Sequence, residues 1–250
     1  MSSPKPLGLP SGEGEFTAAP FGAAAALQVA VDIVIFTILD ADLKVLLRRR
    51  RSPPFEDAWS LPGSFVRLDQ AREDEDLEDV AQRCLSQETR LAPGSVFMEQ
   101  LYTFGRAGRD PRGRVISVVY YALVRPNLAP FVASGENDNE AIWRSVTELD
   151  RLSVAFDHGD MLAVALKRIR GKIDYSPIAF ELVPETFSIP ELRAVFEVIK
   201  GTTYDPGNFR RRFNRMVSDG LIERAPGKRI TASKPAQVFR FVREKGPIDR

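Results

Sequence analysis

Side chains that can contact nucleic-acid bases recur in a short segment near the C-terminal end. If this segment is a helix, at about 100° per residue, the apolar Phe209 and Phe213 lie on one side of it. The opposite side then carries polar and basic side chains, namely Asn208, Arg211, Asn214, Arg215 and Ser218. Arg and Asn can form paired hydrogen bonds with the edges of guanine and adenine in the major groove of DNA. We therefore identify this face as a candidate for sequence-specific DNA contacts.

Further basic residues surround this face. Arg210 and Arg212 lie on its flanks, where the phosphates of DNA would lie, and Lys228, Arg229 and Lys234 follow in a turn-rich segment. An arginine-rich helix face can also be a plain solvated surface, and for a single helix we would favour that interpretation. The order of the surrounding elements is what favours DNA binding.

Two helices and a hairpin are expected around these residues. Ser188-Ile189-Pro190-Glu191 is a capping box with proline in the first turn, so it predicts the start of a helix. Asp205-Pro206 predicts the start of the basic helix. A strand at 221–224, a tight turn at 225–228 and an alternating strand at 238–242 follow. Two helices joined by a brief turn and followed by a hairpin are typical of a winged helix-turn-helix.

The net charge is distributed unevenly along the chain. The 250 residues carry 35 Lys and Arg against 34 Asp and Glu, a net charge of +1. Residues 1–187 hold 21 basic and 27 acidic side chains, a net charge of −6. Residues 188–245 hold 13 basic and 6 acidic side chains, a net charge of +7. This asymmetry indicates that only the C-terminal part meets a polyanion.

The composition excludes several classes of protein. With 44% hydrophobic and 28% charged residues, the chain is neither wholly disordered, nor a fibre, nor a membrane bundle. The single cysteine, Cys84, and the single histidine, His158, can form neither an internal disulfide nor a zinc cluster. There is no secretory signal, and the apolar runs are far shorter than the roughly 20 residues of a membrane helix. We expect a cytoplasmic protein without membrane contact.

The first part of the chain is expected to be a mixed domain of strands and helices. Residues 1–27 are rich in Pro, Gly, Ser and Ala and are expected to form a flexible tail. Strands are predicted at 29–39, 43–47, 96–104 and 115–124, the first two joined by a turn at residues 40–42. One helix is predicted behind Asp76 as its N-cap, and another at 157–170 with Gly171 as its stop. We expect a domain at 28–150, a helical linker at 151–175 and a winged helix at 176–245.

A motif in the first domain resembles the signature of the Nudix hydrolases. That signature is Gly, five residues, Glu, seven residues, and then Arg-Glu-apolar-x-Glu-Glu-x-Gly-apolar. The matching residues are Glu75, Arg83, Leu85, Glu88 and Leu91, with the spacing from Glu75 to Arg83 intact. Ser64 stands in place of the first Gly, the loop before Glu75 is longer by five residues, and Arg90 replaces the last Gly. The resemblance implies a Nudix-like α/β/α sandwich.

Two of the three metal-binding carboxylates of that signature are replaced, by Cys84 and Gln87. Three carboxylates on one helix edge can hold Mg²⁺ beside a pyrophosphate, because this hard ion prefers anionic oxygen. A thiol and a neutral amide do not supply that charge, so we expect no metal site, no cofactor and no hydrolase activity. The alternative is that Glu73, Asp74 or Asp76 in the lengthened loop reaches the site and restores hydrolysis.

Outside this motif the chain resembles the nicotinamide-related transcriptional regulators (NrtR type). The matching segments are Leu101-Tyr102-Thr103-Phe104-Gly105, residues 108–114, Ala155-Phe156-Asp157-His158, residues 178–182, residues 208–211, and Lys234-Pro235-Ala236 with Phe239-Arg240-Phe241. In that family a Nudix-like domain binds ADP-ribose, and a winged helix binds operators of NAD-metabolism genes as a homodimer. The resemblance implies an α+β protein of this architecture. It also implies three partners, namely double-stranded operator DNA, ADP-ribose or a related nucleotide, and a second copy of the chain.

Candidate ligand residues follow from the chemistry of ADP-ribose. A planar guanidinium suits the diphosphate, and Arg50, Arg109 and Arg112 are the candidates. Phe65, Tyr102 and Phe104 could stack on rings, although each aromatic by itself is more often a core residue. Arg67 and Glu88 of the Nudix-like motif complete the set. Residues 48–51 could alternatively be a solvated strand end, and His158 is expected to line the pocket or the domain junction rather than to act as a general base.

We therefore expect a ligand-responsive transcriptional regulator, and of repression and activation we favour repression. The ligand would favour one arrangement of the dimer over another and so change its fit to the operator. Two alternatives stay open. One is an active Nudix pyrophosphohydrolase with a DNA-binding appendage, and the other is a regulator of the same architecture that responds to a sugar.

Overall fold

The protein is described from a computed structural model, which covers residues 27–66, 75–132, 141–230 and 235–242. The expected tail lies almost wholly outside these residues. So do Arg67 and Lys234, and so do Glu73 and Asp74, which were considered as substitute metal ligands.

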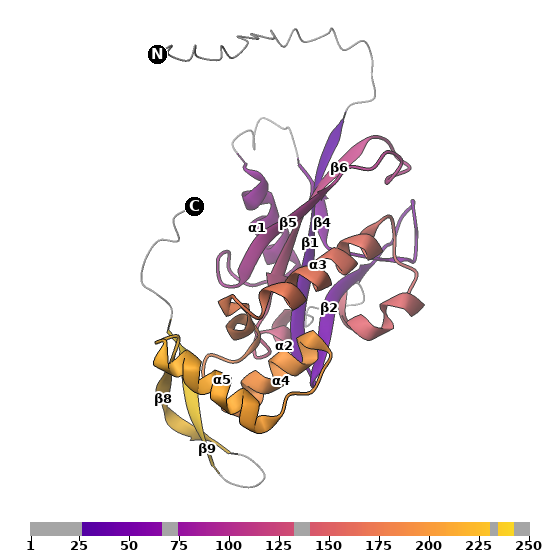
Figure 1. The fold of residues 1–250 in the computed structure, drawn as a ribbon. Helices are drawn as coiled ribbons and strands as arrows, with labels where there is room; N and C mark the ends of the chain where they lie inside the picture. The colour runs from indigo at the N-terminus through magenta and orange to yellow at the C-terminus, as the bar shows by residue number, and fades with distance from the viewer. Residues whose placement is uncertain (1–26, 67–74, 133–140, 231–234, 243–250) are drawn as a thin grey trace, which may run out of the picture.

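A sheet forms the centre of the first part of the chain (Figure 1). Within the described residues it has seven strands: β1 (Gln28–Leu39), β2 (Asp42–Arg49), β3 (Trp59–Ser60), β4 (Gly63–Phe65), β5 (Phe97–Phe104), β6 (Val115–Leu123) and β7 (Ala141–Ser145). Their order is β3-β2-β1-β6-β5, with β4 paired to β1 and β7 paired to β2. β1 and β6 are parallel, whereas the other pairs are antiparallel. The four predicted strands are all present.

The turn between β1 and β2 is where the sequence placed it. Asp40 and Ala41 have φ angles of 54° and 56°, so both central residues are left-handed. Such a turn matches the twist of the two strands that it joins. Along β1, successive side chains enter two different cores, with Ile33 and Ile35 in one and Val34 and Phe36 in the other. The sheet is therefore covered on both faces.

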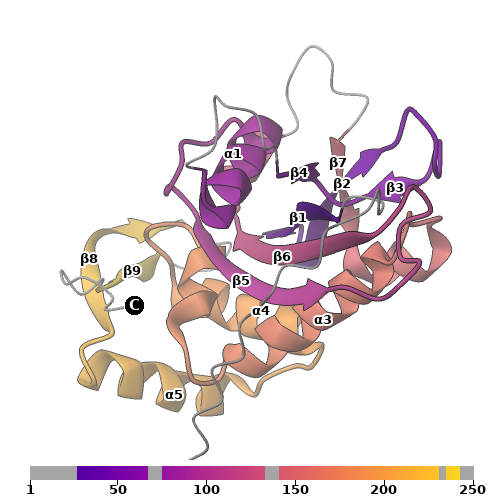
Figure 2. The same ribbon diagram turned by 90° about the horizontal axis from the view of Figure 1, so that it is seen from above.

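One helix covers each face of the sheet, as Figure 2 shows. α1 (Leu77–Thr89) buries Val80, Ala81, Cys84 and Leu85 against one face, and α3 (His158–Lys172) buries Met161, Leu162, Ala165 and Ile169 on the other. The expected α/β/α sandwich is confirmed. The remaining short elements are α2 (Ala129–Val132) and the 3-10 helices η1 (Val146–Arg151) and η2 (Pro177–Leu182).

The expected stop of the second helix at Gly171 is wrong. α3 runs through Gly171 to Lys172, and the next residue, Ile173, keeps a helical backbone. Ile169 and Ile173 are both buried in the core, so the apolar stripe continues past the glycine. A glycine costs a helix only about 1 kcal/mol relative to alanine, which the burial of an isoleucine offsets.

The C-terminal part has the expected elements, namely α4 (Ile189–Lys200), α5 (Pro206–Ser218), β8 (Ile222–Arg229) and β9 (Ala236–Phe241). The capping box is confirmed, because the Ser188 backbone N–H donates to the Glu191 carboxylate at 2.7 Å. The expected tight turn at 225–228 is wrong, since β8 continues through it. Arg224 pairs with Phe239 and Lys228 with Gln237, so the extra residues form an irregularity inside the strand rather than its end.

The two parts of the chain share one hydrophobic core. The core on the α3 side of the sheet extends through η2 into α4, α5 and β9. Phe180 of η2 stacks on Phe241 of β9 with ring centroids 4.5 Å apart, and Phe187 pairs with Phe239. The helices in the described residues include none that is long and apolar enough to cross a membrane.

Candidate ligand pocket and nucleic-acid interface

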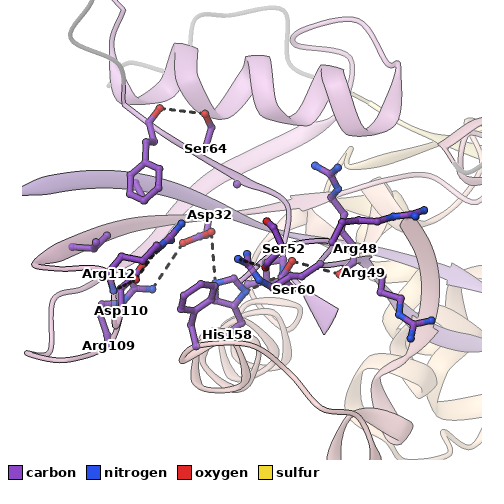
Figure 3. A pocket seen from close by; sticks show the side chains of 18 residues that line it. Asp32, Arg48, Arg49, Ser52, Ser60, Ser64, Arg109, Asp110, Arg112 and His158 are labelled. Atoms are coloured by element: carbon purple, nitrogen blue, oxygen red, sulfur yellow. Dashed lines mark hydrogen bonds and ion pairs between the residues drawn. The ribbon is translucent and has the colours of Figure 1, made fainter. Parts of the chain in front are cut away.

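A cavity of about 420 Å³ opens at one edge of the sheet (Figure 3). Its walls come from β1, the end of β2 and the loop after it, the β3 and β4 segment, the loop before β6, and the start of α3. Polar and cationic side chains line much of it, namely Asp32, Arg48, Arg49, Arg50, Arg51, Ser52, Ser60, Ser64, Arg109, Asp110, Arg112 and His158. Phe65 and Phe156 supply flat apolar surface. The cavity can therefore take an anionic ligand that carries rings.

A close backbone approach forms the floor of this cavity. A Cβ atom on Gly63 would lie 2.3 Å from Oδ1 of Asp32 and 2.8 Å from the backbone oxygen of Val31. Asp32 is itself buried on β1 and accepts a 2.5 Å hydrogen bond from the hydroxyl of Ser117. Glycine at position 63 thus lets β4 pair directly with β1 beside the Asp32 carboxylate. That carboxylate is held by Ser117 of β6.

Arg109, predicted to bind a diphosphate, forms a buried ion pair. Its Nε and Nη2 donate to the Asp157 carboxylate at 2.9 and 2.7 Å, and the two side chains are 3% and 4% exposed. Nη2 also lies 4.0 Å from Oδ2 of Asp32. The Nε and Nη2 edge of this guanidinium, which could donate to a phosphate, is thus already bound to Asp157. Arg109 lines the cavity and ties the loop before β6 to the start of α3.

His158 is a pocket residue, as expected. The backbone N–H of Leu61 donates to its Nδ1 at 2.9 Å, so the ring is neutral with its proton on Nε2. Burial lowers the pKa of His158, which favours the same neutral form. Nε2 lies 3.8 Å from Oδ1 of Asp32. The ring joins the β3 and β4 segment to the first turn of α3.

Arg50 and Arg112 meet around an aromatic ring that sequence reasoning did not select. The guanidinium carbons of Arg50 and Arg112 lie 4.8 and 5.3 Å from the centre of the Phe156 ring. Phe156 lines the cavity, and its backbone is left-handed, with φ of 53°. Its position next to Asp157-His158 in the sequence was the available signal. Burial and the nearby charge of Arg112 lower the pKa of Arg50.

Arg112 is the most accessible of the predicted phosphate ligands. Its side chain is 43% exposed, and its guanidinium lies 5.1 Å from the centre of the Phe65 ring. It donates to Asp110 at 2.6 and 3.0 Å, and this hydrogen bond raises the pKa of Arg112. One edge of the guanidinium is thus held by Asp110 while the remaining surface faces the cavity.

Three of the predicted ligand residues lie outside the cavity lining. Tyr102 is 60% exposed on β5 and contacts Phe104 edge to face at 5.4 Å, and Phe104 packs against the core. Glu88 on α1 accepts a 2.7 Å hydrogen bond from Arg48, which does line the cavity. The structure therefore brings Arg50, Phe65, Arg109 and Arg112 together, and it places Tyr102, Phe104 and Glu88 elsewhere.

The remnant of the Nudix motif is held together by an ion pair. Arg83 donates to both oxygens of Glu75 at 2.7 and 3.0 Å. Cys84 faces the sheet, and burial raises the pKa of its thiol to about 11, so it is protonated at neutral pH. Gln87 is exposed. Over the described ranges, which omit 67–74, no group of three or more His, Cys, Asp or Glu side chains could hold a metal ion.

The surface of α5 agrees with the helical arrangement expected from the sequence. Phe209 and Phe213 are buried, and the opposite face exposes Asn208, Arg211, Asn214, Arg215 and Ser218. Arg211 donates to the Asn208 side chain at 2.5 Å. This face can enter a major groove with its arginine and asparagine side chains directed outward.

Two of the basic residues predicted at the interface have partners within the protein. Arg212 lies over the Phe196 ring at 4.3 Å and donates to the Asp174 carboxylate at 3.4 Å. Arg229 donates to the backbone oxygen of Thr186 at 2.5 Å and lies 3.2 Å from Glu191. Arg210 and Lys228 are exposed.

A groove of about 520 Å³ lies between α4, α5 and the hairpin. Within the described part of the chain, its lining includes three arginines, Arg193, Arg210 and Arg224, and no acidic residue. Sequence reasoning missed Arg193 and Arg224, which come from elements on either side of the basic helix. Among the described residues, the side chains of Arg210 and Arg224 have no hydrogen bond or ion pair. The three cations suit the phosphodiester backbone of a nucleic acid.

Comparison with known proteins agrees with this description. The family model of the NUDIX domain matches residues 27–164, and that of the NrtR DNA-binding winged helix domain matches residues 179–241. The ADPR-responsive transcriptional repressor NtrR of Acinetobacter baylyi is 34% identical over 211 residues, which are 84% of this chain and 80% of that protein. The crystal structure of Shewanella oneidensis NrtR with a 27mer DNA has 32% identity and a TM-score of 0.75, covering 86% and 93% of the two chains.

An enzyme is also among the relatives. The ADP-ribose pyrophosphatase of Methanocaldococcus jannaschii is 34% identical over 126 residues, which are 50% of this chain and 68% of the enzyme. That match covers half of this chain, whereas the two regulators match both parts of it.

Fold and site together define a Nudix domain joined to a DNA-binding winged helix. Within that class, the chain belongs to the NrtR family of transcriptional regulators. The family resemblance and the fold class expected from the sequence are confirmed.

Proposed function

We propose that this chain is a transcriptional repressor whose binding to operator DNA is relieved by ADP-ribose. The carrying observation is that one chain combines a cationic cavity lined by aromatic rings with an exposed Arg and Asn face on α5. Its relative from Acinetobacter baylyi is an ADPR-responsive repressor, which supports the choice of ligand and of repression. NAD-metabolism genes are the proposed targets, and the cytoplasm is the proposed location.

In the ligand pocket, Arg112 and Arg50 would bind the diphosphate, and Phe65 and Phe156 would contact the rings. Arg112 carries this proposal because it is accessible and already lies against both aromatic rings. Arg109 would act indirectly, by holding Asp157 and the start of α3. Arg67, Glu88, Tyr102 and Phe104 stay predictions as ligand residues, and contact with the last two would require a ligand that extends beyond this cavity.

On DNA, we place the exposed face of α5 in the major groove. Arg211, Asn214 and Arg215 would contact base edges, with Asn208 and Ser218 at the margins. Lys228 and Lys234 would contact phosphates, and a DNA strand would lie along the groove of Arg193, Arg210 and Arg224. A homodimer would present two such faces to a palindromic operator. Arg212 and Arg229 would have structural roles, because both are bound within the protein.

The chain is proposed not to hydrolyse ADP-ribose. Its close relatives that match both parts are regulators, and Cys84 and Gln87 lack the negative charge that Mg²⁺ requires. The pyrophosphatase from Methanocaldococcus jannaschii makes hydrolysis the second candidate function. We also propose units at 28–150 and 176–245, joined by a linker at 151–175 that consists largely of α3.

A mobility-shift titration on the promoters beside the protein's own gene tests the proposal. We expect tight binding to one promoter, loss of binding on adding ADP-ribose, and no loss on adding ribose alone. Persistent binding in ADP-ribose would contradict the ligand assignment, and release by a pentose instead would favour the sugar-responsive alternative. Incubation with ADP-ribose and Mg²⁺ forms the second arm, in which robust release of AMP would identify a hydrolase.

A further inference from the structure

A single helix, α3, connects the ligand pocket with α5, the helix that we place in the major groove of DNA. α3 has 15 residues, so it spans about 22 Å at about 1.5 Å per residue. Its first turn lies at the pocket, its last turn contacts α4, and Asp174, two residues beyond its end, contacts α5 (Figure 1). This inference rests on the proposed function, because it concerns how occupancy of the pocket reaches DNA.

At its first turn, α3 is bound to three walls of the pocket. Asp157, the residue before the helix, holds Arg109 of the loop before β6. His158 accepts a hydrogen bond from Leu61 and lies near Asp32 of β1. A ligand that moves any of these walls therefore acts directly on the start of α3.

At its other end, α3 and α4 bind each other in both directions. Arg170 Nε donates to the backbone oxygen of Ile199 at 3.1 Å, and Lys200 Nζ donates to the backbone oxygen of Arg170 at 3.2 Å. Both contacts lie at the C-terminal end of α4, directly before the turn that leads into α5. The last turn of α3 thus fixes where α5 begins.

Asp174, two residues beyond α3, is where this end meets both helices of the winged domain. Its Oδ2 accepts a 2.6 Å hydrogen bond from Lys200 of α4, and its Oδ1 lies 3.4 Å from Nη1 of Arg212 on α5. The backbone oxygen of Asp174 also accepts from Arg212, at 3.4 Å. Arg212 is additionally held over the Phe196 ring of α4. The Asp174 carboxylate therefore joins the end of α3 to both α4 and α5.

We propose that Asp174 is a positioning residue that couples the ligand pocket to DNA binding. It does not line the ligand cavity, and it lies outside α5. It holds α4 and α5 to the end of α3, so that a change at the pocket end of α3 is passed to the orientation of α5. Without Asp174, the pocket and the DNA face would each work, but occupancy of the pocket would alter DNA binding less.

The expected effect is moderate, because the carboxylate is partly exposed and such ion pairs are individually weak. The measured quantity is the ratio of operator dissociation constants with saturating ADP-ribose and without ligand. We expect Asp174→Asn to reduce this ratio about three- to tenfold, since coupling between two sites is carried by the contacts that differ between the two arrangements. Operator affinity without ligand should change less than about threefold.

The experiment compares the wild-type protein with Asp174→Asn, Arg212→Gln and the double variant. Asp40→Asn is the matched control, because Asp40 also pairs with a lysine, Lys44, but does so at the exposed β1 and β2 turn. Asn tolerates the left-handed backbone of position 40. Thermal stabilisation by ADP-ribose is measured for every variant in the absence of DNA, and it should be unchanged. Asp174→Glu should restore part of the ratio.

The outcomes distinguish a failure of the proposed function from a failure of the role proposed for Asp174. If wild-type operator binding does not respond to ADP-ribose, the proposed function is overturned and this inference with it. A second outcome is that the wild type responds to ADP-ribose but Asp174→Asn has the wild-type ratio and differs only in a lower melting temperature. Asp174 would then have a purely structural role, and this inference alone would be overturned. Equal loss in Asp40→Asn would also overturn it. Reduced ratios in both single variants, without further loss in the double variant, would support it.

Discussion

The arginines of the pocket and the arginines of α5 differ in what surrounds them. Arg109 and Arg112 are bound to Asp157 and Asp110, and the Arg50 guanidinium donates to the backbone oxygen of Pro54 at 2.8 Å. On α5, by contrast, Arg210 and Arg215 are exposed and have no acidic partner among the described residues. Both regions are cationic, but these pocket arginines are held by partners within the described residues, whereas Arg210 and Arg215 of α5 are not.

This difference corresponds to two kinds of recognition. A small ligand must find its donors already oriented, because ordering several long side chains on binding costs free energy. DNA presents a long polyanion, and exposed arginines release counterions from it and adapt to its grooves. Replacing a pocket arginine or its partner should therefore affect stability or ligand affinity, whereas replacing an exposed arginine of α5 that the described residues leave unpaired, such as Arg210 or Arg215, should affect DNA affinity alone.

The largest expected effect is on stability, from the buried pair in the pocket. Asp157→Ala should lower the free energy of unfolding by about 3 to 5 kcal/mol, because it removes the two hydrogen bonds that the buried Arg109 guanidinium donates and leaves Asp32, 4.0 Å away, as its remaining ion-pair partner among the described residues. Urea unfolding followed by circular dichroism measures this. Asp160→Ala is the control, since Asp160 is on the same helix turn but 68% exposed, and it should change stability by no more than about 0.5 kcal/mol. Equal effects in the two variants would show that the pair is not structural.

The second-largest expected effect is on sequence-specific DNA binding. Arg211→Ala should weaken operator binding by about 1 to 3 kcal/mol, while binding to unrelated DNA changes little, because a base contact is lost. Lys228→Ala should weaken binding to both DNAs about equally, because a phosphate contact carries no sequence information. Fluorescence anisotropy on operator and scrambled duplexes gives both values. If the Arg211 variant loses affinity for both duplexes equally, α5 is not the reading helix.

A smaller effect is expected for ligand binding by the accessible pocket arginine. Arg112→Ala should raise the dissociation constant for ADP-ribose about tenfold, through loss of a charge-assisted contact to phosphate. Its free energy of unfolding should fall by less than the roughly 3 kcal/mol expected for Asp157→Ala. The Arg112 side chain is 43% exposed, and the buried Asp110 keeps a hydrogen bond from the backbone N–H of residue 112. Isothermal titration calorimetry and urea unfolding separate the two. A large loss of stability with unchanged ligand affinity would reverse the roles assigned to Arg109 and Arg112.

The smallest effect is expected for a basic residue of the hairpin that is already bound within the protein. Arg229→Ala should leave the salt dependence of operator binding unchanged, because its guanidinium is engaged by Thr186 and Glu191. Arg210→Ala should lower the slope of log affinity against log salt by about 1, as expected for one lost phosphate contact. If the two variants have the same slope, the distinction between bound and free arginines fails.

Much of the fold could be predicted from the sequence because its signals are local. The capping box at Ser188, the apolar stripe of α5 and the β-branched run of β1 each depend on residues within a few positions of one another. The errors came where distant residues outweighed the local signal. Gly171 lies inside α3 because Ile173 is buried in the core. β8 runs through 225–228 because it pairs with β9 both before this segment, at 222–224, and after it, at 228–229.

The candidate sites divide in the same way. The exposed face of α5 was predictable, since helical geometry alone places Arg211, Asn214 and Arg215 opposite Phe209 and Phe213. The pocket was only partly predictable. Its walls come from five separate segments, and neither the inclusion of Phe156 nor the exclusion of Tyr102 has a local cause.

By itself, therefore, the sequence determined the elements, the family resemblance, the charge asymmetry and the residues that α5 exposes. The tertiary structure decided which cations are available. Arg109, Arg212 and Arg229 are as basic as their neighbours in the sequence, yet each lies against an acid that is far along the chain. A charge becomes structural or functional according to which groups the fold places within a few ångströms of it, and those neighbours come from segments far apart in the sequence.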